Sequence, residues 1–344
     1  MQLLQEMVIL LILIDGSEAG GQLLRTACAL SAITKKEFKI KNIRGARPNP
    51  GLKTQHIEGV KAIGKICNAK IKGLKLNSKE LEFYPSELEA KNLKIGVSTA
   101  GSIGLILQAL LLATSLLKDS IKIEIEGGGT WNKWAPPVAY LKNVFLPLLG
   151  DESEIKIIRE GFYPKGGAKV SVKTKPLRLR KIEILEKGKM NEILGFSISS
   201  KHLKKAKVLE RMIEKTRELI KEKFNVECKI EGSYVDSYSP GCGILIYIKT
   251  ENSIIGSDSL GELGKPAEDV AKDVVKNLIF EYANGAVDRH AADMLLPYMA
   301  LYGSGEIKTS EITHHVRMNA KVIEKFLPVK FEINEKEKVI KVLS

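Results

Sequence analysis

His314 and His315 stand at the start of a segment with a helical pattern, where an imidazole could act as a nucleophile. Apolar residues recur at helical spacing after them, at Val316, Ala320, Ile323 and Leu327. Ser310 and Thr313 are candidate N-caps, so we expect His315 in the first turn. Free N–H groups and the positive end of the helix dipole favour anions there and keep an imidazole neutral, able to attack phosphorus. A histidine in this place is more commonly a cap or a core residue.

A glycine-rich turn near the N-terminus offers a second set of polar groups. Residues 12–34 predict a strand, a turn and a helix, with Glu18, Gln22 and Arg25 on the polar side of the helix start. The glycines would let the backbone approach a phosphate closely. The segment is neither a Walker A motif nor a dinucleotide-binding motif, and an ordinary strand-to-helix connection also explains it.

Two arginines three positions apart, Arg44 and Arg47, lie on a Pro/Gly-rich loop over residues 44–51. Such a loop can hold guanidinium groups in a fixed pose for phosphate recognition, although a solvated basic loop has the same composition. Gln55 and His56 follow on a predicted helix. The spacing of His56 to Val60 is as typical of a histidine at the core edge as of a catalytic one.

Isolated polar residues interrupt two apolar helices. Gln108 lies in the helix predicted from residue 103, and an amide there needs a partner, either a backbone group or a bound base. Asp288, His290 and Asp293 lie in the first turns of a later apolar helix. Asp288 is a candidate cap, whereas Asp293 lies at a position where the helix is expected to face the protein interior.

Composition favours a globular protein with an anionic partner. The 344 residues carry a formal charge of +13, as expected for binding nucleic acid or nucleotide phosphates, although a lysine-rich, heat-adapted proteome gives the same bias. The apolar run at residues 7–14 is too short to span a bilayer and is predicted to be a buried strand. Residues 1–6 are expected to be either an extension or the product of an upstream start codon. The four cysteines form no CxxC pair, so we expect reduced, buried thiols, no structural zinc and a cytoplasmic location.

The chain has the pattern of repeated units with an insertion. The strand–helix segments that begin at Ile12 and Ile95 look alike, and a third starts near residue 161 and resumes towards the C-terminus. From Leu177 a compact α/β module is predicted, including one long helix over residues 201–224 whose basic face is either solvated or follows RNA backbone. The predicted domains are 1–180, 181–280 and 281–344, the first and last forming one large domain.

Seven blocks occur in a characteristic order: IDGSEAGGQLLR, IRGARPNPGLKTQH, TAGSIGLILQ, APPVAYL, GFYPKGG, HAADMLLPYMAL and HHVRMNAKVIEKFLPVKF. Together they resemble the RNA 3′-terminal phosphate cyclases over nearly the whole chain. The resemblance implies an α/β (α+β) fold in which three repeated βαβαββ-like units form a large domain with an inserted small α/β domain.

The resemblance also implies an ATP-dependent, ligase-type reaction on RNA that ends in a 3′-phosphate. A histidine attacks the α-phosphate of ATP and becomes a tele-AMP-histidine, AMP passes to the 3′-phosphate, and the neighbouring 2′-OH closes a 2′,3′-cyclic phosphate. A divalent ion, Mg²⁺ or Mn²⁺, would neutralise the triphosphate charge.

Family roles transfer to matching positions of this chain. The implied catalytic residues are His315, Glu18, Arg25, Arg44 and Arg47, with Glu18 also near the metal. The implied ATP-binding residues are Gln108, Pro136, Tyr140, His290, Ala291, Ala292, Asp293 and Met294. Gln55 and His56 match positions that support the site or hold RNA phosphate. His290 stands where better-known members have an adenine-stacking tyrosine, and an imidazole stacks with less area.

Three other functions remain to be compared. A branch of the same fold acts in ribosome assembly and lacks the nucleophilic histidine, which is present here. A non-catalytic RNA-binding protein has only the charge and the basic helix in its favour. A transferase of the enolpyruvyl-shikimate-phosphate synthase type shares the repeated units but none of the seven blocks. The sequence leaves the oligomeric state and the physiological RNA open.

Overall fold

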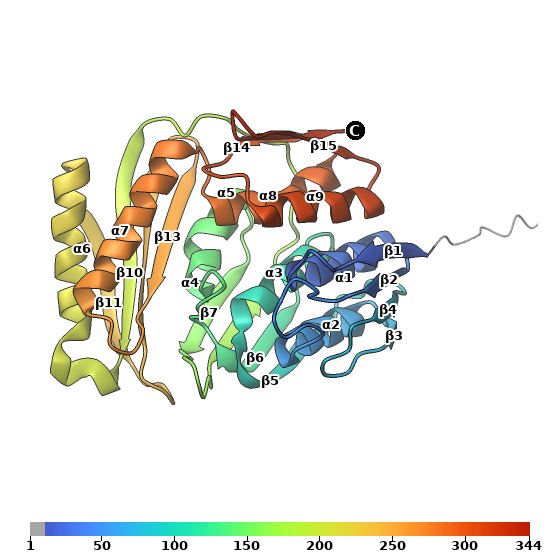
Figure 1. The fold of residues 1–344 in the computed structure, drawn as a ribbon, viewed down its shortest axis with the longest axis horizontal. Helices are drawn as coiled ribbons and strands as arrows, with labels where there is room; N and C mark the ends of the chain where they lie inside the picture. Colours follow the sequence, from blue (N-terminus) through green and yellow to red (C-terminus); the bar gives the residue numbers. More distant parts are fainter. Residues whose placement is uncertain (1–10) are drawn as a thin grey trace, which may run out of the picture.

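The computed structural model describes residues 11–344, which form mixed sheets with helices packed between them (Figure 1). Half of the strand predicted over residues 7–14 lies outside this range; within the described half, residues 12–14 belong to β1, Ile12–Asp15. The extension predicted at residues 1–6 lies outside the described residues.

The first unit has a parallel strand pair followed by a hairpin. Its elements after β1 are α1 (Gln22–Thr34), β2 (Phe38–Lys41), α2 (Thr54–Ile66), β3 (Lys70–Lys72) and β4 (Leu81–Tyr84). The sheet order is β1-β2-β4-β3, with β1 and β2 parallel and the other pairs antiparallel. A parallel pair needs a crossover, which α1 supplies.

The second unit repeats this topology. Its elements are β5 (Leu93–Ser102), α3 (Ile103–Thr114), β6 (Lys122–Gly129), α4 (Val138–Tyr140), the π-helix η1 (Leu141–Phe145), α5 (Leu146–Leu149), β7 (Glu154–Arg159) and β8 (Lys169–Lys173). The order β5-β6-β8-β7 again places one parallel pair beside two antiparallel pairs.

The third unit is interrupted after its first strand. Its elements are β9 (Ile182–Ile184), α8 (Arg289–Tyr302), β14 (Gly305–Lys308), α9 (His314–Phe326), β15 (Lys330–Asn334) and β16 (Val339–Leu343). Its order, β9-β14-β16-β15, has the same sequence of parallel and antiparallel pairs. The prediction of three βαβαββ-like units is confirmed. The prediction that the third unit starts near residue 161 is wrong, because β8 (Lys169–Lys173) pairs with β6 and β7 of the second sheet, and the third unit starts at β9.

The insertion has its own sheet and apolar core. It contains β10 (Met190–Ser200), the 3₁₀ helix η2 (Lys201–Ala206), α6 (Val208–Phe224), β11 (Cys228–Val235), β12 (Cys242–Thr250), β13 (Ile254–Leu260) and α7 (Ala267–Asn284). The prediction of one continuous helix over residues 201–224 is wrong. Lys207 has φ 49° and stands between η2 and α6, and a residue with positive φ cannot continue a right-handed helix.

The two ends of the insertion meet at the turn between β12 and β13. The Asn252 N–H donates to the Lys187 carbonyl at 3.1 Å, before β10. The Ser253 hydroxyl donates to the Ala286 carbonyl at 2.5 Å, after α7. The predicted domain ranges stay a prediction; because β9 pairs with β14, the sheet pairing favours an insertion that begins after Ile184.

Helices of all three units pack together in the centre of the large part of the molecule. Figure 1 shows α1, α3, α8 and α9 between the sheets, with α6 and α7 at the opposite side of the molecule from β1–β4. The apolar helix α3 is buried on nearly all sides because α1, α2 and α8 surround it. Within residues 11–344 no helix is long and apolar enough to cross a membrane. The four cysteines are buried and free, as predicted.

Candidate active site

His315 occupies the second position of α9, where the helix presents unpaired backbone N–H groups. Thr313 is the N-cap, as predicted, and its Oγ1 accepts a hydrogen bond from the Val316 N–H at 3.2 Å. On the opposite side α9 buries Ile323 and Phe326 in the core. Packing therefore fixes the helix while His315 stays exposed at its start.

The glycine turn before α1 lies against three of the predicted site residues. A methyl group added at Gly20 would lie 3.5 Å from Arg47 Nη2 and 3.9 Å from His315 Cε1. A methyl group at Gly21 would overlap the His56 ring, at 2.1 Å from Nε2. The absence of side chains here allows two imidazoles and a guanidinium group to approach the same stretch of backbone.

His314 links α9 to this turn. Its Nε2 lies 2.7 Å from the Glu18 carbonyl oxygen, so the ring N–H donates to the backbone at that point. The sequence assigned His314 no role, and the structure gives it a positioning one. The bond holds the start of α9, and with it His315, beside the turn that precedes α1.

The pKa of His315 is lowered from its ordinary value of 6.5. The main cause is withdrawal of the ring from water by the surrounding protein, and the next causes are the positive charges of Arg25 and Arg47. Both effects disfavour the imidazolium form. His315 is therefore neutral at pH 7 and has a nitrogen lone pair available for attack on an electrophile.

His56 is also neutral but is enclosed. It is 5% exposed, and burial, followed by the charges of Arg25 and Arg44, lowers its pKa to about 3. The Lys53 N–H donates to Nδ1 at 3.1 Å, so the ring proton is on Nε2, the nitrogen that faces Gly21. His56 thus caps the start of α2 and closes one side of the glycine turn.

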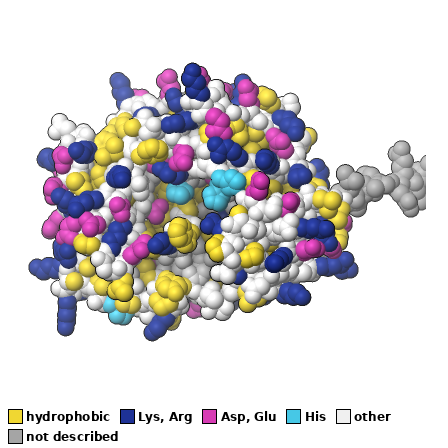
Figure 2. Space-filling model, in the orientation of Figure 1, with side chains coloured by type: hydrophobic (Ala, Val, Ile, Leu, Met, Phe, Trp, Pro, Cys, Tyr) yellow, Lys and Arg dark blue, Asp and Glu magenta, His cyan; other side chains and the backbone are white. Residues whose placement is uncertain are grey.

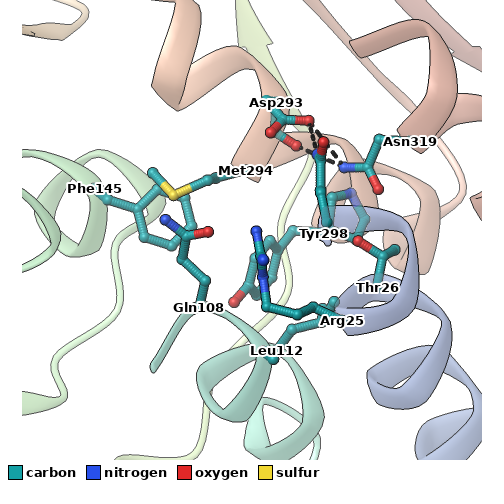
Figure 3. Close-up of a pocket in the computed structure, with 12 residues that line it drawn as sticks. Arg25, Thr26, Gln108, Leu112, Phe145, Asp293, Met294, Tyr298 and Asn319 are labelled. Carbon is teal, nitrogen blue, oxygen red and sulfur yellow. Dashed lines mark hydrogen bonds between the residues drawn. The ribbon is translucent and has the colours of Figure 1, made fainter. Parts of the chain in front are cut away.

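Below His315, a polar cluster joins helices of the first and third units. Gln22 and Asn319 both donate to the Asp293 carboxylate, the latter at 3.2 Å (Figure 3). Burial raises the pKa of Asp293 to about 6, although the hydrogen bond from Gln22, the positive charge of Arg25 and the hydrogen bond from Asn319 each act to lower it. Burial lowers the pKa of Arg25 to about 10, and Asp293 opposes that shift. Arg25 stays protonated and supplies a positive charge beneath the site.

A small hollow beside Arg25 has polar atoms with free hydrogen-bonding capacity. Figure 3 shows the Gln108 amide, from α3, pointing into it opposite Arg25 and Tyr298. The hollow measures about 40 Å³, which suits water or the edge of a ligand but not a whole nucleotide. Among the described residues no group accepts from the buried Tyr298 hydroxyl or donates to Asn319 Oδ1.

The start of α8 is held by a buried carboxylate. Asp288 is the N-cap, as predicted, and accepts from the His290 N–H at 3.0 Å and the Ala291 N–H at 2.9 Å. It also accepts from the Tyr140 hydroxyl at 2.6 Å and from the Gly256 N–H of β13 at 2.9 Å. The His290 side chain is exposed at the helix start. The rings of His290 and Tyr140 meet edge to face, with their centroids 6.0 Å apart.

Seen from outside, histidine side chains form two neighbouring patches near the middle of one face, beside a hollowed area (Figure 2). Lysine and arginine side chains border this area together with hydrophobic and acidic ones. His290, His314 and His315 are exposed at the starts of α8 and α9, and helix starts of this kind favour phosphate groups.

Comparison with known proteins gives a consistent result. The family model described as RNA 3′-terminal phosphate cyclase matches residues 16–333. A relative of that name from Thermococcus gammatolerans is 42% identical over 327 residues, 93% of each chain. Relatives of the same name from Pyrococcus furiosus and Methanosarcina barkeri are 42% and 41% identical, covering 94% and 96% of this chain and 95% and 98% of their own. This chain belongs to the RNA 3′-terminal phosphate cyclase family.

Two residues that the resemblance placed in the cyclase site form no hydrogen bond or ion pair with His315 among the described residues. The Arg44 guanidinium folds onto its own loop and donates to the carbonyls of Asn49 at 2.8 Å and Gly51 at 3.0 Å. Glu18 is exposed, and among the described residues its carboxylate forms no hydrogen bond or ion pair; only its carbonyl oxygen is bonded, to His314. Their predicted roles in catalysis stay predictions.

The residues expected to bind ATP divide into exposed and buried groups. His290 is exposed, and Gln108 and Asp293 are half-buried. Five are buried: Pro136, Tyr140, Ala291, Ala292 and Met294. Tyr140 supports the start of α8 from beneath instead of lining an open surface. Gln55 binds the backbone, with its Oε1 accepting from the Ser102 N–H at 3.0 Å.

The donors available for a divalent ion are few. Over residues 11–344 no three His, Cys, Asp or Glu side chains form a cluster that could hold a metal. Mg²⁺ commonly binds one or two carboxylates and takes its other ligands from phosphates and water. The described residues therefore offer no all-protein metal cage.

Sequence reasoning missed Asn319, Tyr298 and His314 as parts of the site. Asn319 is a buried amide between Met318 and Ala320 on the inner face of α9. A buried amide on an apolar helix face requires a partner, and applying to Asn319 the argument made for Gln108 would have identified it. The Tyr298 hydroxyl has no comparable pattern in the sequence.

Proposed function

We propose that this chain converts the 3′-terminal phosphate of RNA to a 2′,3′-cyclic phosphate at the expense of ATP, with His315 as the nucleophile. The observation that supports it most is the position of a neutral, exposed imidazole at the start of α9. Family membership and relatives named for this activity support the overall reaction. The covalent mechanism is the finer part of the proposal.

In the first step the His315 Nε2 lone pair attacks the α-phosphorus of ATP. An N–P bond forms, the α–β phosphoanhydride bond breaks, and pyrophosphate leaves. The free N–H groups of α9 and the charges of Arg25 and Arg47 stabilise the negative charge that develops on the phosphoryl oxygens. The positive charge left on the ring makes it a good leaving group for the next step.

In the second step an oxygen of the RNA 3′-phosphate attacks the same phosphorus and displaces the imidazole, which leaves AMP joined to the RNA end. In the third step the adjacent 2′-OH attacks the RNA phosphorus, loses its proton, and expels AMP. One difficult displacement by the 2′-OH is thereby divided into steps with better leaving groups.

The remaining residues have binding roles in this proposal. His290, exposed at the start of α8, would stack on the adenine, and Gln108 would bind its polar edge. Tyr140 and Asp288 would keep His290 in position through the helix start. A divalent ion would neutralise the triphosphate, with Glu18 as its candidate protein ligand.

The proposal is tested by incubating the protein with ATP labelled at the α-phosphate and then with 3′-phosphorylated RNA. Label on the protein should be stable in alkali and lost in acid, as expected for a phosphoramidate. It should then move to RNA, whose end becomes resistant to phosphatase. Cyclisation without protein-bound label would contradict the covalent route, and no cyclisation would contradict the function.

The two arginines of the loop are expected to behave differently. Arg47→Ala should slow self-adenylylation by about 10²–10³-fold. Unfolding in urea should be unchanged, because the exposed Arg47 guanidinium forms no hydrogen bond or ion pair among residues 11–344. Arg44→Ala removes two bonds within the loop and should increase proteolysis of residues 44–51. An Arg47→Ala rate equal to wild type would show that this loop is merely solvated.

The pH dependence of self-adenylylation follows from the lowered pKa of His315. The rate should stay level as the pH falls through 6.5, because the ring remains neutral there, and should decline only at lower pH. Arg47→Ala removes a positive charge, raises the pKa towards 6.5, and should move the decline to higher pH. Arg317→Ala is the matched control, since Arg317 lies on the same helix but pairs with Glu335; an equal shift in this variant would exclude a local effect of Arg47.

A further inference from the structure

Two hairpin turns of the second unit present aromatic side chains to solvent. Trp134 is 81% exposed and Tyr163 is 80% exposed. Each lies in a turn closed by a β-bridge, between Asn132 and Ala135 in one case and between Phe162 and Gly166 in the other. A single exposed apolar side chain is common on a protein surface, so the feature that matters is that two such aromatic rings lie on turns that contact the same residue, Ala100. The cyclisation chemistry uses neither of them.

Both turns rest against the strand end that leads to the candidate active site. The Asn132 amide donates to the Ala100 carbonyl at 2.8 Å, and a methyl group at Gly166 would lie 3.0 Å from Ala100 Cα. Two residues later, the Ser102 N–H donates to Gln55. Gln55 precedes His56, whose ring faces the glycine turn. The aromatic turns and the site are thus joined by a short series of direct contacts.

Cations accompany the aromatic rings. Lys133 Nζ lies 5.5 Å from the Trp134 ring, and the Arg159 guanidinium lies 4.6 Å from the ring of Tyr238. Tyr238 is 54% exposed and packs on the backbone at Gly167, so it borders the turn that carries Tyr163. Hydrophobic and basic side chains border the hollowed area next to the histidines (Figure 2).

The turns are fixed to the insertion as well as to the second unit. Lys133 pairs with Glu262 at 3.0 Å, and the Lys165 N–H donates to the Ser239 hydroxyl at 3.1 Å. Aromatic groups held on such turns lose little conformational entropy when a planar ligand stacks on them. Rings interleaved with cations match the alternating bases and phosphates of a single strand.

We propose that Trp134 and Tyr163 form a stacking platform for the unpaired bases that precede the 3′-phosphate of the RNA substrate. This inference rests on the proposed function for the identity of the ligand. A protein partner would instead favour one continuous apolar patch, whereas these rings stand singly, and those of Trp134 and Tyr238 each have a cation close by. The platform would select substrates by the length of their single-stranded end.

The two tryptophans of the chain make the platform directly observable. Trp131 is 1% exposed and Trp134 is 81% exposed, so quenching of tryptophan fluorescence by RNA reports on Trp134. The probe is a ten-nucleotide RNA with a 3′-phosphate and a 2′-deoxy terminal nucleotide, which cannot cyclise. Stacking should quench the signal in the wild type, and Trp134→Phe should remove the quenching while retaining most of the affinity.

Affinity supplies the second measurement. Trp134→Ala and Tyr163→Ala should each weaken binding of the ten-nucleotide RNA by about ten-fold, with no change for a 3′-phosphorylated dinucleotide or in self-adenylylation. Tyr302→Ala is the matched control, because Tyr302 is 47% exposed at the far end of α8 from His290. Unchanged affinity in both alanine variants, or an equal loss for the dinucleotide, would overturn the platform.

The binding measurement needs no ATP and no reaction, so its outcome is independent of the His315 chemistry. Labelled His315 together with unchanged RNA affinity in the variants would reject the platform and leave the proposed function standing. Length-dependent binding without label on His315 would support the platform and reject the covalent mechanism.

Discussion

Replacement of His315 by alanine is expected to abolish labelling of the protein by ATP and to reduce the cyclisation rate by more than about 10⁴-fold. The variant has no nitrogen that can accept AMP, and the free N–H groups of α9 can bind a phosphate but cannot form the intermediate. The fold should persist, because the side chain is exposed and Thr313 still caps the helix. Labelling and circular dichroism measure the two effects separately.

His314→Ala is the control for this experiment. It removes the bond between the His314 ring and the Glu18 carbonyl, so the start of α9 should become less ordered and labelling slower, yet label should still appear. A protein that remains labelled after His315→Ala, or that loses all label only after His314→Ala, would show that the nucleophile has been assigned to the wrong residue.

Asp288→Ala should lower the free energy of unfolding by about 3–5 kcal/mol. Four donors lose their acceptor at once: the Tyr140 hydroxyl, the Gly256 N–H and two N–H groups at the start of α8. All four groups lie in or beside the buried interface between the insertion and the large domain, where water cannot replace the carboxylate without cost. Urea unfolding measures the change.

Tyr140→Phe provides the comparison, since it removes only one of the four bonds and should cost about 1 kcal/mol. Asp288→Asn retains one carboxyl-like oxygen and should fall between the two. If Asp288→Ala were no more destabilising than Tyr140→Phe, the carboxylate would not be the common acceptor that links the insertion to α8. ATP affinity should also fall in Asp288→Ala, because His290 follows the same helix start.

Local patterns predicted most of the fold. Helix α9, its Thr313 cap and the position of His315 follow from apolar spacing and cap chemistry within a few residues. The break between η2 and α6 at Lys207 could not be predicted in this way. Lys207 has a positive φ, and lysine is not a residue type that favours this conformation. The membership of β9 in the third sheet depends on a partner in β14, and no local pattern specifies such a distant pairing.

For the site, the sequence predicted which residue types take part better than it predicted where their side chains point. Arg47 lies near His315, whereas Arg44 turns back to its own loop, although the two arginines have the same chemistry and almost the same position. The bond between Gln22 and Asp293 joins residues 271 positions apart. Side-chain direction and long-range pairing depend on the packing of helices from different units, so they required the structure.

The meeting of the insertion's two ends has a consequence for how the chain assembles. Strand β9 must find β14 across roughly 120 residues, and the entropy lost in closing a loop grows with the logarithm of its length. A folded insertion already holds Lys187 and Ala286 at a single turn, which leaves only short segments to be closed. The third sheet therefore forms at the lowest entropic cost after the insertion has folded. During synthesis from the N-terminus, α9 with His315 emerges later still, so the chain gains its nucleophile only when almost all of it has been made.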